Sequence, residues 1–339
     1  MIFIRPITHK DFKSLQSLAH AAKTGLTSLP KDKSLLQEKI GKSVEAFAST
    51  SQKKGESLYL FVMENPKKAE IIGVSGIISK RNPKTPFTSY TLEVQKQHCP
   101  ILSIEREMRI LKPKISTHQR SEICSLFLMP QHRKEGLGQL LSLSRFHFIA
   151  SHMKRFESNI VAELRGVQDR NGNSPLWNSL GKHFVNLEFA EAEILYSNDM
   201  SFVQELMSKY PIYVDLLPKK AQEVIGKPHQ DTLPAMRLLE KEGFCFENDV
   251  DPFDGGPFLR AFTKHIRSIN KSRVLTVGKI LVKAPSTKTY IISNLDVDFR
   301  ACFSPIRISK NQSVTLSVDA AKTLRVNAGD QIRCIPAYT

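Results

Sequence analysis

Apolar and polar positions along the first eighty residues predict a strand, two helices and a hairpin. Residues 2–6 form a short apolar run, which predicts a strand. Residues 8–20 carry apolar side chains at three-residue steps, as on the buried face of a helix, and residues 33–47 form a second amphipathic stretch. Two apolar runs at residues 58–63 and 71–78, separated by a turn-rich segment, predict an antiparallel hairpin.

The middle of the chain predicts a strand, a helix and a second strand in succession. Residues 122–128 have the pattern of a buried strand, residues 137–153 that of a long helix and residues 159–164 that of a further strand. This order is typical of a βαβ unit, so we expect part of the sheet to be parallel. Residues 174–181 predict a short helix with Ser174 as its N-cap and a glycine at its end.

Two other parts of the chain are less regular. Residues 80–120 carry mixed signals, with short strands expected at residues 91–94 and 101–104. Residues 234–244 predict another short helix closed by a glycine, and helical periodicity is absent from residue 273 onward. The β-rich segments of this last part are residues 274–282, 289–292, 299–303, 314–318 and 331–335. They predict a small β-barrel or sandwich attached to an α/β body, or a tail that packs into that body.

The composition is that of a globular protein in a reducing compartment. Of 339 residues, 41% are hydrophobic and 24% are charged, and the length predicts two halves or one large domain with an appendage. No apolar stretch approaches the ~18 residues of a membrane span, and the N-terminus lacks the pattern of an export signal. The five scattered cysteines argue against a disulfide framework or a zinc site. We therefore expect a cytoplasmic protein without a membrane partner or a metal site.

The formal net charge of +16 raises the question of an anionic partner. The basic residues are spread along the chain and interleaved with acidic ones, without an aromatic-rich RNA-binding motif or zinc-finger spacing. We therefore expect a basic enzyme that does not bind nucleic acid. Part of the excess charge is expected to serve an anionic ligand.

A basic, glycine-containing turn follows the strand at residues 122–128. It contains Arg133, Lys134, Gly136 and Gly138 and leads into the long helix. The N-terminus of a helix attracts anions, and glycines allow the main chain to approach a phosphate closely. A glycine-rich turn alone is weak evidence. This one lacks the terminal Lys-Ser/Thr of a P-loop and does not follow the first strand, as a dinucleotide site would. Its place after several strands resembles the GNAT acyltransferase superfamily.

Ordered motifs along most of the chain resemble those of arginine N-succinyltransferases. They lie at residues 23–30, 122–128, 133–146, 162–167, 174–182, 223–229, 239–244 and 253–257. The resemblance implies a mixed α/β, GNAT-like acyl-CoA N-acyltransferase core with a small C-terminal β-rich domain. Residues 1–190 would form the acyl-CoA-binding half, residues 191–270 a second α/β segment that completes the active site, and residues 271–339 the β-barrel-like region.

The same resemblance implies an activity and a set of functional residues. Members of the family transfer a succinyl group from succinyl-CoA, a co-substrate, to the α-amine of L-arginine in arginine degradation, with no permanently bound cofactor. By resemblance, Leu126, Phe127 and Leu128 line the pantetheine arm, and a main-chain N–H near Leu126 polarises the thioester. His229 matches the catalytic histidine, described as a proton donor. From the residues alone, His229 would be read as a surface or loop-capping histidine.

Candidate residues for the acceptor are less well determined. Thr27, Ser28 and Arg165 belong to the motifs, and the carboxylate of arginine needs a cation or backbone donors, but helix capping and surface ion pairing explain these residues equally well. Glu163 is expected to orient water, to accept the ammonium proton or only to pair with Arg165. The family pattern has an acidic residue where this chain has Arg260. If that acid reads the basic end of the substrate, Arg260 favours another amine.

Three hypotheses follow from the sequence. The first is an active succinyl-CoA:arginine N-succinyltransferase, acting as a homo-oligomer or with a related second subunit. The second is an acyl-CoA-binding subunit of a mixed arginine/ornithine succinyltransferase, or an N-acyltransferase for another amine. The third, a basic nucleic-acid-binding protein, rests on charge alone and ranks far below the others.

Overall fold

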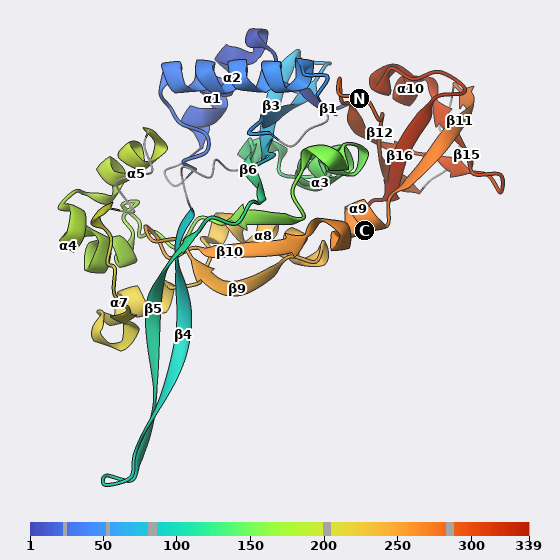
Figure 1. The fold of residues 1–339 in the computed structure, drawn as a ribbon. Coiled ribbons are helices and arrows are strands. Elements are labelled where there is room, and N and C mark those ends of the chain that lie inside the picture. The colour runs from blue at the N-terminus through green and yellow to red at the C-terminus, as the bar shows by residue number, and fades with distance from the viewer. Residues whose placement is uncertain (23–25, 52–54, 81–86, 199–204, 283–287, 339) are drawn as a thin grey trace.

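One mixed sheet runs through the protein from end to end (Figure 1). The computed structural model describes residues 1–339 except 23–25, 52–54, 81–86, 199–204, 283–287 and 339. The described strands are β1 (Phe3–Pro6), β2 (Leu58–Asn65), β3 (Glu70–Ile78), β4 (Phe87–Cys99), β5 (Ile104–Ser116), β6 (Ser121–Leu128), β7 (Asn159–Glu163), β8 (Ile212–Tyr213), β9 (Cys245–Val250), β10 (Pro257–Phe262), β11 (Arg273–Leu281), β12 (Thr289–Ser293), β13 (Ala301–Pro305), β14 (Arg307–Ile308), β15 (Ser313–Ser317) and β16 (Gln331–Pro336). Their order in the sheet is β14-β15-β11-β16-β12-β13-β1-β2-β3-β6-β7-β10-β9-β4-β5-β8.

Helices cover both faces of the central strands. They are α1 (Phe12–Ala21), α2 (Lys33–Ala48), α3 (Leu137–Ser151), α4 (Lys182–Val185), α5 (Phe189–Asn198), α7 (Lys219–Val224), α8 (Leu233–Lys241), α9 (Arg267–Asn270) and α10 (Val318–Leu324). The buried apolar side chains of α1 and α2 pack with Leu60, Val62 and Val74 on one face of β2 and β3. Among the described residues, no helix is long and apolar enough to cross a membrane.

Helix α3 lies at the centre of the molecule. Every residue from Leu140 to Ile149 is buried, because α3 packs against several strands of the sheet and also against α8 and α9. A helix buried all round must be apolar on most of its faces, and α3 is. The predicted βαβ unit is confirmed, since β6, α3 and β7 follow in order and β6 pairs with β7 in parallel.

The strands predicted at residues 91–94 and 101–104 are wrong in extent. One long antiparallel hairpin, β4 and β5, occupies this region, with Phe87 paired to Ser116 and Cys99 to Ile104. Residues 101–103 form its turn and not a strand. Both faces of the outer hairpin are exposed, so its sequence lacks the apolar-polar alternation of a half-buried strand.

The helix predicted at residues 174–181 exists, but it does not end at Gly181. Ser174 caps it as predicted, because its Oγ accepts a hydrogen bond from the N–H of Trp177 at 3.1 Å. A π-helical turn over Trp177–Gly181 then leads into α4, which ends at the left-handed Asn186. Gly181 is required by packing, since a Cβ there would lie 2.3 Å from the Trp177 ring.

The C-terminal part contains a helix that periodicity did not predict. Helix α10 has a Ser317 N-cap whose Oγ accepts from the N–H of Ala320, and at seven residues it is too short for a clear periodic signal. The strands around it have their own apolar core, which includes Leu275, Val314 and Leu316. They also join the body, because β13 pairs with β1 through Phe3 and Ile4. The domain boundaries at residues 190 and 270 stay predictions.

Candidate active site

Strands β6 and β7 separate after a short parallel contact. In the described chain their ladder consists of Ser121 with Ile160 and Glu122 with Val161. Beyond these pairs β6 stays paired to β3, while β7 stays paired to β10. The carboxyl half of β6 therefore presents one edge of its backbone that β7 does not cover. Such an edge can accept an extended ligand as an additional strand.

A β-bulge reshapes β6 at Ser125. The register against β3 shifts between Val74 and Gly76, and Ser125 has a left-handed backbone with φ of 52°. Ser28 holds this residue from the N-terminal loop: its Oγ accepts from the N–H of Ser125 at 3.0 Å, and its carbonyl accepts from the Ser125 hydroxyl at 3.0 Å. The structure thus brings Ser28 to the strand predicted to line acyl-CoA, directly before Leu126. Residues 23–25 of the same motif lie outside the described residues.

The side chains after the bulge belong to the core. Leu126 and Leu128 pack with the apolar cluster around α3, and Phe127 packs with the cluster under α1 and α2. Core packing explains why these three positions are apolar. The main-chain groups at the open edge are still available for the predicted contact with a pantetheine arm.

The turn between β6 and α3 has the geometry of an anion site. Arg133 folds back on the strand, with its Nε donating to the Leu128 carbonyl at 3.0 Å and its guanidinium 5.8 Å from the Phe127 ring centroid. Gly136 is left-handed with φ of 71° and immediately precedes the first residue of α3. A Cβ at Gly138 would have no heavy atom within 4 Å, so the first turn of α3 is open. The N-terminus of a helix with such access binds phosphate well.

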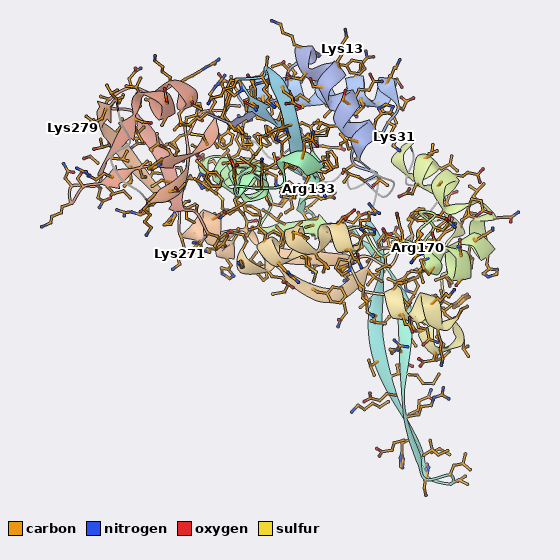
Figure 2. All side chains as sticks on the ribbon, turned by 180° about the vertical axis from the view of Figure 1, so that it is seen from behind. Lys13, Lys31, Arg133, Arg170, Lys271 and Lys279 are labelled. Atoms are coloured by element: carbon orange, nitrogen blue, oxygen red, sulfur yellow. The ribbon has the colours of Figure 1, made fainter. Side chains whose placement is uncertain are left out.

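Basic residues lie at this turn and also in other parts of the molecule. Arg133 lies in the middle of the molecule, between the N-terminal helices and the layer of β9 and β10 (Figure 2). Lys134 beside it is exposed. The other labelled residues, Lys13, Lys31, Arg170, Lys271 and Lys279, are distributed over separate parts of the molecule (Figure 2).

His229 is attached to the end of β7. Its N–H donates to the Arg165 carbonyl at 2.8 Å, and the preceding residue, Pro228, forms a β-bridge with Gly166. The Nδ1 of its ring accepts from the N–H of Asp231 at 3.1 Å. A neutral imidazole with Nδ1 as acceptor carries its proton on Nε2. The carboxylate of Asp231 lies 3.8 Å from the same Nδ1 and would stabilise the imidazolium form, which is the form that a proton donor requires.

Two buried aspartates hold the backbone segment around Gly166, next to the carbonyl that binds His229. Asp254 accepts from the N–H of Gly166 at 2.7 Å and from that of Gly256 at 2.8 Å. Asp251 accepts from the N–H groups of Phe253 and Asp254. Burial, and secondarily the charges of Asp254 and Glu163, raise the pKa of Asp251 well above its usual value. Ionisation of both carboxyl groups together is therefore disfavoured.

Sequence reasoning missed these aspartates as part of the site. The contacts that give them a role join residues 88 positions apart, as between Asp254 and Gly166. The glycines next to these aspartates are the feature of the sequence that indicates the contact. A Cβ at Gly256 would lie 2.1 Å from the Leu164 carbonyl, and one at Gly166 would lie 2.4 Å from the Asp254 carbonyl. Only glycine allows these two motif segments to touch.

Arg165 lies beside this pair and has a side-chain donor without a hydrogen-bond partner. Its side chain is half buried, and its Nε is buried without a hydrogen-bond partner. Burial lowers its pKa, while the charges of Asp231 and Asp254 oppose that shift. A guanidinium with an unused buried donor is suited to a carboxylate. Glu163, two residues earlier, pairs across the sheet with Phe258 and is close enough to Asp251 to affect its pKa.

The remaining candidates divide into three cases. Thr27 is half buried in the turn before Ser28. His147 is buried in α3 and its pKa falls to about 3 through burial, which excludes it from proton transfer near neutral pH. Arg260 forms ion pairs with Glu247 at 2.8 Å and Asp249 at 3.5 Å.

Comparison with families of known proteins matches almost the whole chain. The family described as "Arginine N-succinyltransferase beta subunit" matches residues 2–268. The family described as the C-terminal domain of that same subunit matches residues 273–336.

Individual relatives and a solved structure agree with this match. The "Arginine N-succinyltransferase" of Enterobacter sp. (strain 638) is 37% identical over 337 residues, covering 99% of this chain and 97% of that protein. The "Arginine N-succinyltransferase subunit beta" of Pseudomonas aeruginosa is 37% identical over 341 residues, covering 99% and 98%. The solved structure of arginine/ornithine succinyltransferase subunit AI from P. aeruginosa superimposes with a TM-score of 0.90 at 35% identity, covering 100% of this chain and 99% of that one. The predicted mixed α/β fold is confirmed.

The raised pKa of Asp251 predicts a pH-dependent stability. Because its pKa is raised in the folded chain, this group stabilises the fold fully below its unfolded pKa of ~3.9, and the contribution is lost as pH rises through the folded pKa. Asp251→Asn keeps the acceptor and cannot ionise. We expect the free energy of unfolding of the wild type to fall relative to that of Asp251→Asn as pH rises above the unfolded pKa. Denaturant unfolding as a function of pH measures it, with exposed Asp319→Asn as the control. Parallel profiles for wild type and Asp251→Asn would contradict the raised pKa.

Proposed function

The chain belongs to the arginine N-succinyltransferase family, and we propose that it transfers a succinyl group from succinyl-CoA to the α-amine of L-arginine, giving N2-succinyl-L-arginine and CoA. The observation that carries this proposal is the likeness over nearly the full length to acyltransferases of that name. The open edge of β6, next to the glycine turn before α3, supports it, because this edge suits an extended thioester with phosphates at one end.

The reaction uses groups from both sides of the gap between β6 and β7. The phosphates of CoA lie at the turn with Arg133, Lys134, Gly136 and Gly138, and the pantetheine arm lies along β6. A main-chain N–H near Leu126 donates to the thioester oxygen and stabilises the negative charge that develops there. The bulge at Ser125, held by Ser28, sets the direction of these N–H groups.

Proton transfers complete the reaction. The ammonium of the acceptor first loses a proton, for which Glu163 is the proposed acceptor, and the neutral amine attacks the thioester carbon. A C–N bond forms and the C–S bond breaks. The thiolate takes the Nε2 proton of His229 in its protonated, imidazolium form, which leaves a neutral ring with Nδ1–H beside the Asp231 carboxylate. The second proton released by the amine then protonates Nε2 again.

Arg165 is the proposed binding group for a carboxylate of the substrates. Both L-arginine and the succinyl group carry one. The unused Nε–H of Arg165 lies on the residue whose carbonyl holds His229, so a carboxylate bound there would be next to the reacting groups. Thr27 and Ser28 face the acceptor from the N-terminal loop beside β6 in this proposal.

A second candidate activity follows from the names of two relatives. The P. aeruginosa proteins are a "subunit beta" and a subunit of an arginine/ornithine succinyltransferase. Ornithine is therefore the alternative acceptor, and a related second chain the alternative partner. We propose a cytoplasmic location for either activity, consistent with the five free cysteines.

The direct test is release of the CoA thiol by the purified chain. We expect turnover with succinyl-CoA and L-arginine, and less with ornithine as acceptor or acetyl-CoA as donor. The same measurements after adding a homologous chain would identify the mixed enzyme. Failure of every donor and acceptor pair, with and without that chain, would overturn the proposed function.

His229→Ala should lower kcat by about 10²- to 10⁴-fold, because the leaving thiolate loses its proton donor. The KM for succinyl-CoA should change little, since His229 lies at β7 and the CoA phosphates lie at α3. His183→Ala removes an exposed histidine from α4 and is the matched control. Full turnover in His229→Ala would remove this residue from the mechanism.

Arg165→Ala should lower kcat/KM by about 10- to 100-fold through the loss of a charged hydrogen bond. Agmatine, which lacks the carboxylate of arginine, and acetyl-CoA, which lacks that of succinyl-CoA, identify which carboxylate is bound. The variant should lose its preference for the natural substrate in only one of these comparisons. Arg170→Ala, an exposed position nearby in the chain, is the control. Two unchanged preferences would contradict this role.

A further inference from the structure

The β4–β5 hairpin extends from the body as a free arm (Figure 1). Its last pairs with the rest of the sheet are Thr91 with Asp249 and Ile110 with Tyr213. Among the described strands, none outside the hairpin pairs with residues 92–109. Figure 2 shows the same arm clear of the body from behind. At ~3.3 Å per residue, the ribbon reaches about 30 Å beyond its last contact. A two-stranded ribbon of this kind is marginally stable in water by itself.

Exposed apolar side chains gather at the two ends of the arm. At the tip, Ile101 is 93% exposed, and Leu102 and Ile104 are also exposed. At the root, next to β5, Leu216 is 80% exposed and Tyr213 is exposed beside it. Apolar patches of this kind on a protruding segment are typical of protein interfaces.

The root is rigid enough to receive a partner. Arg109 on β5 donates through Nη2 to Asp215 at 3.1 Å and to Gln222 at 2.7 Å. Asp215 belongs to the short turn that carries Leu216. The exposed side chain of Leu216 is therefore held at a defined position relative to the arm.

The charge of the arm favours a partner with the same surface. Residues 92–109 contain three acidic residues, Glu93, Glu105 and Glu107, and three basic residues, Lys96, Arg106 and Arg109, so their net charge is zero with His98 neutral. The whole chain has a net charge of +16. Two copies would repel each other at most surfaces, whereas two arms meet without net repulsion. Acidic and basic side chains alternate across the ribbon, as Lys96 with Glu107, and such a pattern can complement a copy of itself.

We propose that the β4–β5 arm is a dimerisation element whose partner is the arm of a second copy of this chain. The two arms lie antiparallel about a two-fold axis, so the tip of each covers the root of the other, at Leu216 and Tyr213. A two-fold axis requires the same contact twice, and apolar ends with a charge-balanced middle satisfy this requirement. Pairing also covers the exposed strand edges of both ribbons.

Sedimentation velocity and light scattering test the dimer. The wild type should have twice the 38.3 kDa mass of one chain. The double variant Ile101→Asp/Leu102→Asp, and separately Leu216→Asp, should lower the mass to that of one chain. Val282→Asp, which changes an 88% exposed valine in the C-terminal part, is the matched control and should remain dimeric. All substituted side chains are exposed, so circular dichroism and the melting temperature should match the wild type.

Cross-linking tests the tip-to-root arrangement. Under mild oxidation the double variant Ile101→Cys/Leu216→Cys should form a covalent dimer that the Leu216→Cys variant alone does not form. A wild type with the mass of one chain, including one that pairs only with a homologous chain, would overturn the proposal. A dimer that survives both the tip and the root substitutions, or one without the cross-link, would do so as well.

Discussion

The separation of two parallel strands is the constraint on which the rest of this structure depends. When β6 leaves β7 after Glu122, the backbone groups on one edge of β6 lose their neighbours. Backbone N–H and C=O groups that are shielded from water need partners. The fold provides some of them: Ser28 bonds the bulge at Ser125, and Arg133 bonds the Leu128 carbonyl. The uncovered edge is suited to an extended ligand that would complete the strand.

The other side of the gap is held by a pair of buried carboxyl groups. Burial raises the pKa of both Asp251 and Asp254, and the charge of Asp254 raises that of Asp251 further. Asp254 accepts a hydrogen bond from the N–H of Gly166. The adjacent Arg165 carbonyl accepts one from the N–H of His229. The position of His229 is thus set by a chain of backbone contacts that starts in a carboxyl pair.

Local patterns predicted most elements of the body, because α1, α2, β2, β3 and the β6–α3–β7 unit each bury one face or a whole segment. Prediction was wrong where that burial is absent or the segment is short. The outer hairpin is exposed on both faces, and α10 has only seven residues. Gly181 indicated a helix end, but the Trp177 ring next to it explains the glycine. In the site, the turn at Arg133 follows from sequence, whereas the role of Asp254 depends on a contact 88 residues away.

Arg260 shows how the surroundings decide what a departure from a family pattern means. On β10 it lies opposite Val161, on the same face of the sheet as Glu163, where a free cation would oppose a basic acceptor. Its guanidinium is instead paired with Glu247 and Asp249. Asp249 also accepts from Lys114 at 2.7 Å and from Thr91 at 2.6 Å, so Arg260 belongs to a charge network that joins β9 and β10 to the root of the arm. This charge is therefore neutralised within the sheet, whereas Arg165 at the end of β7 keeps a buried Nε donor without a hydrogen-bond partner.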